Sequence, residues 1–202
     1  MKTVKEVSED EMIACFLKAE IISPRYKNIL LSILKHFNET TEVLKKPNIN
    51  DENENDIRYK ILTEFRGYGK RTHLFDGFPY DVKWYEVWLT KKEVNKIRYA
   101  NYSYWIKLSD NTRNPKIAAK NLQKGKKVFG ESNENYFNAV EALKEGKKFN
   151  KIILVAKDKN SGLITLEGHL RLTAYFLEDK LLSNRLKTII GFSKNMNKWG
   201  LY

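Results

Sequence analysis

Hydrophobic and polar positions in the C-terminal half of the chain follow two periods, and the change between them predicts a strand hairpin followed by a helix. An apolar run over residues 151–157 leads into polar turn residues over 158–162 and then into a second apolar run over 163–167. This order predicts two strands joined by a tight turn. From His169 onward the spacing is helical, and the predicted buried stripe is Leu170, Ala174 and Leu177.

The N-terminal part has helical periodicity. Ser8 and Glu11 form a capping-box pattern ahead of the first apolar stretch. Ser23 and Pro24 predict the N-cap and first residue of a second helix. The apolar stripe of that helix is Tyr26, Leu30, Ile33, Leu34 and Phe37.

Residues 38–55 are polar and contain Pro47, so they predict a flexible connection. Helical spacing then returns in a third segment, at Ile57, Ile61, Leu62 and Phe65. A helix-turn-helix that reads DNA is disfavoured here, because the second helix lacks the basic residues such a motif uses.

The rest of the chain mixes strand and helix signals. Residues 84–89 alternate like the first strand of a sheet, and residues 186–192 predict its closing strand. Helices are predicted from Asn114-Pro115 onward and over residues 134–145. We therefore predict an α+β fold with two parts, a helical cap over residues 1–70 and a small mixed sheet with flanking helices over residues 71–202.

Composition limits the function classes. The 202 residues are 42% hydrophobic, which is enough for a substantial core. No apolar run reaches the roughly 20 residues of a membrane span, and the first ten residues lack the pattern of a secretory signal. The single cysteine, Cys15, allows no internal disulfide and predicts a reducing, cytoplasmic location.

Charge is divided unevenly along the chain. Residues 1–57 hold 8 basic and 11 acidic side chains, whereas residues 58–202 hold 29 and 14. The basic excess points to a phosphorylated ligand or a polyanionic partner, nucleic acid included. The alternative is that the basic charge only keeps the protein soluble, because the lysines are scattered along the sequence and form no basic stripe as long as a helix.

The richest chemistry lies where the second predicted strand meets the helix. The strand ends on Glu167, and Gly168 allows a sharp turn there. His169 and Arg171 fall on either side of Leu170 and are predicted to face outward, beside the free N–H groups of the helix N-terminus. This arrangement favours a phosphate or carboxylate site. The structural alternative is an ion pair of Glu167 with Arg171 that only holds the strand to the helix.

This segment resembles the short box of the ParB/sulfiredoxin-like superfamily, specifically over residues 151–192 and more loosely from Trp84. The box is Gly-Glu-Arg-Arg in ParB partition proteins, Gly-Cys-His-Arg in sulfiredoxin and Asp-Gly-His-His-Arg in the related free serine kinases. Here it reads Glu-Gly-His-Leu-Arg over residues 167–171. Gly168 and Arg171 match all three versions. The segment is also similar to that of a bacterial ParB-like family with an N-terminal helical part.

Glu167 and His169 match only the kinase-type box, with Glu in place of its Asp. His169 occupies the position of sulfiredoxin's nucleophilic cysteine, which excludes sulfinic acid reduction by that route. Leu170 replaces the family's second His or Arg and so removes one phosphate donor.

The resemblance implies a nucleotide- or phosphate-binding domain, with phosphoryl transfer or nucleotide hydrolysis as the expected chemistry. Glu167 would serve as base or Mg²⁺ contact, His169 as acid, base or phosphate donor, and Gly168 and Arg171 would bind phosphate. Thr112 and Arg113 precede a predicted helix and are the expected remote phosphate contacts. The alternative function is a nucleic-acid-associated or regulatory binding protein that uses its basic surface without catalysis.

Three further patterns carry weaker signals. The glycine-containing basic segment over residues 66–71 fits an anion-binding loop or, more simply, a basic turn. Four aromatic rings within residues 99–105 favour core packing over base stacking. Three histidines and one cysteine share no ligand spacing, so no metal site is predicted.

Overall fold

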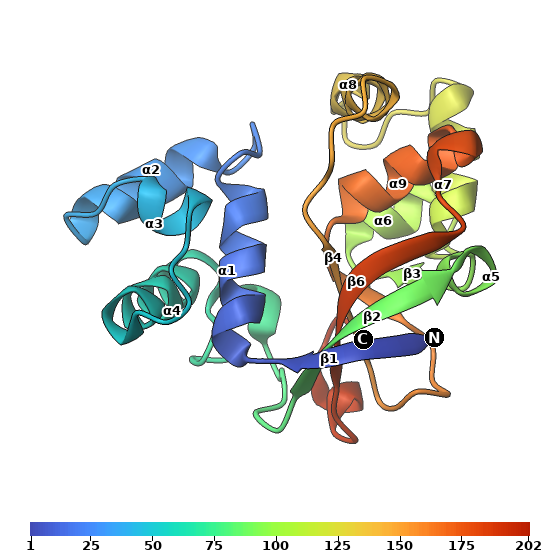
Figure 1. Ribbon diagram of the computed structural model, residues 1–202. Helices are drawn as coiled ribbons and strands as arrows, with labels where there is room; N and C mark the ends of the chain where they lie inside the picture. The colour runs from blue at the N-terminus through green and yellow to red at the C-terminus, as the bar shows by residue number, and fades with distance from the viewer.

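The computed structural model describes all 202 residues, and its centre is one six-stranded mixed sheet (Figure 1). The strand order is β1-β2-β6-β4-β5-β3. Strands β6 and β4 are parallel, as are β5 and β3, whereas the other neighbours are antiparallel. The predicted α+β class is confirmed. The strands span Lys2–Val7 (β1), Lys83–Thr90 (β2), Arg98–Tyr99 (β3), Ile152–Ala156 (β4), Ile164–Glu167 (β5) and Arg185–Phe192 (β6).

Strand β1 is an addition to the predicted sheet. It pairs antiparallel with β2, so that Val7 lies opposite Trp84. Only Val7 is buried among its six residues, because β1 is an edge strand with charged side chains on its surface. Such a strand shows no alternation of apolar residues, which is why no strand was predicted there. The boundary predicted at residue 70 stays a prediction, although β1 belongs to the sheet.

Four helices form a lobe beside the sheet, which we call the helical lobe: α1 (Glu9–Glu20), α2 (Lys27–His36), α3 (Glu42–Lys45) and α4 (Glu52–Arg66) (Figure 1). The capping box of α1 is confirmed, since the Ser8 side chain accepts from the Glu11 N–H and the Glu11 side chain accepts from the Ser8 N–H. Helix α2 begins three residues after Pro24, because hydrogen-bonded turns from Ser23 precede it.

The prediction of a flexible connection over residues 38–55 is wrong for two stretches, because α3 occupies residues 42–45 and α4 already begins at Glu52. Val43 and Leu44 of α3 are buried, and α3 packs against α4. The fully buried Arg58 of α4 donates to the carbonyl of Val43 at 3.2 Å and to that of Asn48 at 2.9 Å. One guanidinium therefore orders a polar segment whose own sequence has little helical character.

The other face of the sheet carries the remaining α-helices (Figure 1). They are α5 (Lys91–Val94), α6 (Ser103–Leu108), α7 (Pro115–Gln123), α8 (Glu134–Lys144) and α9 (His169–Leu177), with 3₁₀ turns at His73–Phe75, Asp179–Leu181 and Met196–Lys198. None of the helices combines the length and apolar character needed to cross a bilayer.

Two hydrophobic clusters lie on the two faces of the sheet. Ile153 and Val155 belong to the cluster shared with the helical lobe, whereas Ile152 and Leu154 belong to the cluster under α6 to α9. Burial on both faces explains why residues 152–156 form an unbroken apolar run rather than an alternating one.

Residues 199–202 pack closely against the fold. Trp199 is 2% exposed, and its indole N–H donates to the carbonyl of Leu74 at 2.7 Å. The carbonyls of Leu201 and Tyr202 accept hydrogen bonds from Arg113. The C-terminus therefore ties the loop before β2 to the loop before α7.

Candidate functional site

The strand-to-helix junction has the predicted form. Strand β5 ends at Glu167, Gly168 adopts φ +97°, and α9 begins at His169. A Cβ on residue 168 would lie 3.1 Å from both Arg171 Nη2 and Ile152 Cγ1, so conformation and space both favour glycine. No side chain caps the first turn of α9, which leaves its N–H groups without a side-chain acceptor.

Arg171 turns back over the junction instead of facing outward. Its guanidinium forms an ion pair with Glu167, and the two side chains are only 12% and 10% exposed. Nη1 of Arg171 also donates to the carbonyl of Asn150 at 2.8 Å. The outward orientation predicted for these residues is wrong, because Arg171 follows Gly168 by one helical turn and so reaches the end of β5.

His169 also points inward. Its ring stacks on Trp105 at 4.9 Å and 16° and on Tyr99 at 5.7 Å and 25°. Burial, reinforced by the positive charges of Arg66 and Arg171, lowers the pKa of His169 to about 3, so the imidazole is neutral at physiological pH. Its Nε2 is buried and has no hydrogen-bond partner. The prediction that the aromatic rings of residues 99–105 pack within the fold is confirmed. Two of these rings, those of Tyr99 and Trp105, pack on the candidate site residue His169.

The buried stripe of α9 differs from the predicted one. Ala174 is buried as predicted, but Leu170 and Leu177 are only partly buried. Leu172 and Phe176 take the main core positions, because α9 packs against α7 and α8 as well as the sheet. The helix is therefore rotated from the expected orientation, which brings His169 under the aromatic rings.

Two residues of the helical lobe complete the site. Glu20 was not predicted, and Arg66 was predicted only as part of the basic segment over residues 66–71. Glu20, at the end of α1, is 8% exposed and pairs with Arg66 of α4 at 3.2 Å. The Arg66 guanidinium lies 4.1 Å from the ring centroid of Tyr26. Glu20 follows Met12 and Phe16 at four-residue spacing, so a carboxylate on an apolar stripe was the available signal.

Two ion pairs, Glu20–Arg66 and Glu167–Arg171, lie close enough for their charges to affect each other, and we call these four side chains the inter-lobe network. Burial raises the pKa of Glu20 to about 7, and the charge of Glu167 adds to the effect against the opposing pull of Arg66. Burial likewise raises the pKa of Glu167 despite its partner Arg171. Both carboxyl groups are desolvated and their charges repel, so ionisation of both groups at once is disfavoured near neutral pH.

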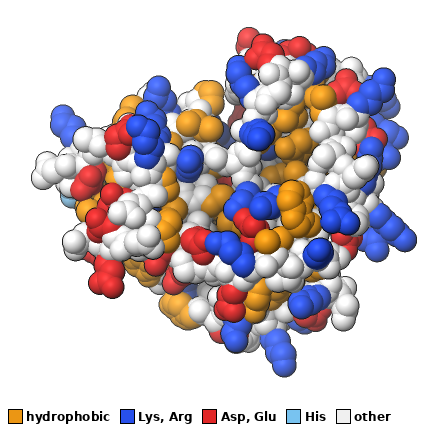
Figure 2. Space-filling view, viewed as in Figure 1, with side chains coloured by type: hydrophobic (Ala, Val, Ile, Leu, Met, Phe, Trp, Pro, Cys, Tyr) orange, Lys and Arg blue, Asp and Glu red, His pale blue; other side chains and the backbone are white.

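The network lies where the helical lobe meets the β5–α9 junction. Figure 2 shows a hollow in the surface between the helical lobe and the rest of the molecule. One ion pair spans the two sides of this hollow: Arg25, ahead of α2, lies 3.9 Å from Glu131, ahead of α8. Both side chains are largely exposed, so the contact adds little stability. The Arg25–Glu131 ion pair is therefore only a weak link between the helical lobe and the segment before α8.

Thr112 and Arg113 are not part of the inter-lobe network. Arg113 donates to the carbonyls of Tyr99 at 2.8 Å, Tyr202 at 3.1 Å and Leu201 at 3.4 Å, while the Thr112 hydroxyl donates to the Ser109 carbonyl at 2.6 Å. Their polar groups thus support the backbone. Tyr99 separates Arg113 from the junction, since its carbonyl accepts from Arg113 and its ring packs on His169.

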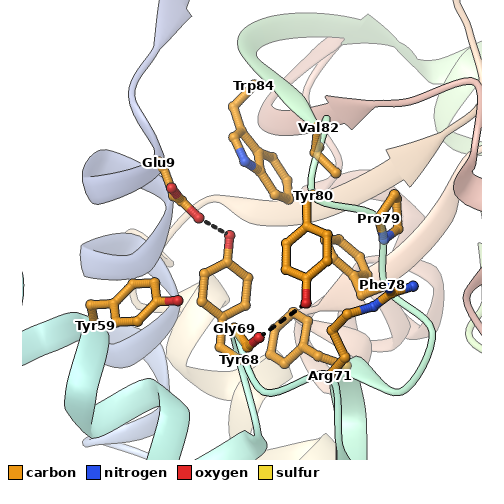
Figure 3. A pocket seen from close by; sticks show the side chains of 11 residues that line it. Glu9, Tyr59, Tyr68, Gly69, Arg71, Phe78, Pro79, Tyr80, Val82 and Trp84 are labelled. Atoms are coloured by element: carbon orange, nitrogen blue, oxygen red, sulfur yellow. Dashed lines mark hydrogen bonds between the residues drawn. The ribbon is translucent and has the colours of Figure 1, made fainter.

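The basic segment over residues 66–71 does not form a single anion loop. Arg66 points into the inter-lobe network, whereas Arg71 lies against the Tyr80 ring at 4.8 Å. Gly67, with φ +79°, ends α4 between them. The segment instead contributes Tyr68, Gly69 and Arg71 to a small aromatic pocket that Tyr59 of α4 also lines (Figure 3).

The side chains near the network offer no ready metal centre. No group of three or more His, Cys, Asp or Glu side chains is placed to hold an ion. Cys15 lies close by, and burial, with the charge of Glu167, raises the pKa of its thiol to about 11. The thiol is therefore protonated, which disfavours a role as nucleophile or metal ligand.

Comparison with known proteins adds no assignment to this geometry. No protein-family model, curated protein or solved structure matches the chain. The inter-lobe network and the surface around it are therefore the basis for any functional assignment.

Proposed function

We propose that this chain is a ParB/sulfiredoxin-like protein that binds a phosphate-bearing ligand, in the first instance a nucleotide, in the hollow above the inter-lobe network. The observation that carries the proposal is the buried, unpartnered Nε2 of His169 beside the uncapped first turn of α9, with Arg66 and Arg171 close enough to lower its pKa. Buried polar atoms are normally paired, so one left without a partner at such a place fits a ligand contact.

Each residue has a defined role in this proposal. Arg171 and Arg66 supply positive charge for the phosphate, and the backbone of α9 adds N–H donors. Neutral His169 donates or accepts one hydrogen bond. The carboxyl pair of Glu20 and Glu167 holds a proton near neutral pH and so suits acid–base steps of phosphoryl transfer or hydrolysis.

A metal ion would enter this site with the nucleotide. The two carboxylates of Glu20 and Glu167 are suitable oxygen ligands for Mg²⁺, but the ion needs six, so phosphate oxygens and water would supply the others. To bind the phosphate, Arg171 must give up part of its ion pair with Glu167. Ligand binding would therefore change the protonation of the Glu20 and Glu167 carboxyl groups.

A thermal-shift panel of nucleoside mono-, di- and triphosphates, with and without Mg²⁺, tests the proposal. A ligand at 100 times its Kd should stabilise the fold by about 2.7 kcal/mol, a rise in Tm of roughly 5–10 °C for a chain of this size. The shift should disappear in Glu20→Gln/Arg66→Gln, which removes both charges of that pair, and persist in Arg185→Ala, which removes an exposed arginine at the start of β6.

Arg171 needs a paired variant, because Arg171→Ala alone leaves Glu167 buried without its partner. The double variant Glu167→Gln/Arg171→Gln removes both charges and keeps the side-chain shapes. It should fold and fail to respond to nucleotide. A panel that leaves the wild-type Tm unchanged, or a shift that survives in both network variants, would remove the support for a phosphate site here.

A second candidate function rests on the surface of α7. Lys116, Lys120 and Lys124 lie at four-residue spacing along this helix and its end, all exposed and none in an ion pair. The structure therefore contains a basic stripe along α7. The lysines are scattered along the sequence, so this stripe was not predicted. A groove of about 440 Å³ lies nearby, lined by Lys107, Lys126 and the exposed ring of Phe129, among others.

Lysines and an aromatic ring in a groove suit the backbone and bases of a nucleic acid strand. Charge reversal at Lys116, Lys120 and Lys124 should weaken binding of a single-stranded oligonucleotide and lower the slope of log K against log salt by about 1 for each lysine that pairs with a phosphate. Reversal of three exposed lysines of the helical lobe, at Lys27, Lys35 and Lys45, is the matched control. Equal effects of the two sets would indicate general charge rather than a binding surface.

A further inference from the structure

A second pocket lies beside the start of α1, away from the inter-lobe network. It encloses about 70 Å³, and most of its wall is aromatic (Figure 3). The rings come from three parts of the chain: Tyr59 from α4, Tyr68, Phe78 and Tyr80 from the loop that follows, and Trp84 from β2. Glu9, in the first turn of α1, supplies a carboxylate.

The inner rings are held in fixed orientations by edge-to-face packing. Tyr68 lies 5.7 Å from Tyr59 at 72° and 4.7 Å from Phe75 at 77°, and Phe78 lies 5.1 Å from Phe75 at 90°. An aromatic ring carries negative potential on its faces and positive potential on its edges. A rigid group of such rings can therefore present ring faces to a cation without rearrangement.

The mouth of the pocket is also ordered. Tyr80 is 75% exposed, yet its ring is held between the Arg71 guanidinium at 4.8 Å and a hydrogen bond from its hydroxyl to the Gly69 carbonyl at 3.5 Å. Gly69 has φ +72°, and a Cβ there would overlap the Tyr59 hydroxyl at 2.0 Å. Tyr59 and Tyr80 therefore have side chains held in one orientation by their neighbours.

The charges around the pocket favour a positive ligand. The Tyr68 hydroxyl donates to one oxygen of Glu9, and the other oxygen has no protein partner. Arg71 lies on the other side of Tyr80, with its guanidinium directed toward Pro79 and away from Glu9 (Figure 3). The segment that supplies Glu9 is also the acidic part of the chain, since residues 1–57 carry 8 basic and 11 acidic side chains.

We propose that this aromatic pocket binds the quaternary ammonium group of a small organic cation, with Tyr68, Tyr80 and Trp84 as cage walls and Glu9 as counter-charge. Aromatic cages recognise methylated ammonium groups through cation–π attraction combined with apolar contact. The accessible space of about 70 Å³ is small, so the pocket suits a compact group such as trimethylammonium better than a whole nucleotide or sugar.

Titration of the full chain with choline, followed by NMR of the Trp84 indole and the Gly69 amide, tests this proposal directly. The matched probe is 3,3-dimethylbutan-1-ol, which has the shape of choline and carries no charge. Choline should perturb these two signals at low millimolar concentration, and the neutral alcohol should bind roughly tenfold more weakly.

Two variants link the binding to the pocket. Tyr80→Ala removes an exposed ring, and Glu9→Gln removes the charge while it keeps an acceptor for Tyr68; each should weaken choline binding roughly tenfold. Phe137→Ala removes an aromatic ring that is 43% exposed on α8, in neither proposed site, and it should leave choline binding unchanged.

Three results would overturn the proposal. The first is equal binding of choline and its neutral analogue, which would indicate a purely apolar cavity. The second is binding of acetate or phosphate near Tyr80 in place of choline, which would assign the pocket to Arg71, whose Nε has no hydrogen-bond partner. The third is binding of a trimethyl-lysine peptide without any binding of choline, which would indicate a protein partner. None of these results depends on the inter-lobe network.

Discussion

The carboxyl group of Glu20 should make the stability of the protein depend on pH in a specific way. Burial raises its pKa from 4.5 in the unfolded chain to about 7 in the native state. Between these values the native state holds a proton that the unfolded chain has released. The free energy of unfolding must therefore fall as pH rises through this window, which is opposite to the behaviour of a carboxylate stabilised by its ion pair.

The size of the effect follows from the same two values. A difference of about 2.5 in pKa corresponds to about 3 kcal/mol when the whole window is crossed. The side chain is 10% exposed, so solvent screens it little. Glu167 adds to the same trend, because its pKa is raised as well.

Glu20→Gln removes the titrating group and keeps a side-chain oxygen that can accept from Arg66. We expect the stability of this variant, relative to wild type, to rise by about 2–3 kcal/mol between pH 5 and pH 8. Urea unfolding at constant ionic strength, measured by tryptophan fluorescence at each pH, gives this difference. Glu6→Gln, on the exposed surface of β1, is the control and should leave the pH profile parallel to that of wild type.

The reasoning is refuted if the Glu20→Gln and wild-type profiles run parallel over this range. That result would mean that Glu20 is ionised throughout and that Arg66 fully compensates its burial. The proton assigned to Glu20 near neutral pH would then have no basis.

Three further predictions concern single positions. Arg58→Met should destabilise the fold by about 3–5 kcal/mol in urea unfolding, whereas Lys60→Met on the exposed side of the same helix should change it by less than about 1 kcal/mol. Gly168→Ala should cost at least about 2 kcal/mol and exceed the cost of Gly125→Ala, which has a similar φ of +82° but open space around it; equal costs would show that crowding at the junction is unimportant. Cys15 should resist thiol reagents at pH 8 in native protein and react in urea, and rapid native labelling would contradict its burial.

Local signals in the sequence predicted much of the fold. Strands β4 and β5, the turn at Gly168 and the capping box at Ser8 all follow from short-range patterns, because neighbouring residues decide turns and caps. Strand β1 and helix α3 escaped prediction since each depends on a distant partner, β2 for the strand and Arg58 for the helix.

The candidate site was predicted only in part, because local spacing shows which residues lie together but not how they are oriented. Glu167, His169 and Arg171 lie together as their spacing indicates, but their orientation depends on how α9 packs against the rings of Tyr99 and Trp105. The contribution of α1 and α4 required the tertiary structure, because no local pattern pairs these helices with the β5–α9 junction. The sequence features that marked these helices were a carboxylate on the apolar stripe of α1, Glu20, and the basic segment that begins with Arg66 at the end of α4.

The position of β6 in the sheet has a consequence for biosynthesis. This strand is the last of the six to leave the ribosome, yet it lies between β2 and β4 and joins the β1–β2 ribbon to the β4–β5–β3 group. Until residues 185–192 are available, the two groups have no backbone pairing between them, and the flanks of β2 and β4 remain open edges. A nascent chain stalled before β6 therefore presents two unpaired strands to its surroundings, and this is the stage at which aggregation or chaperone binding is most expected.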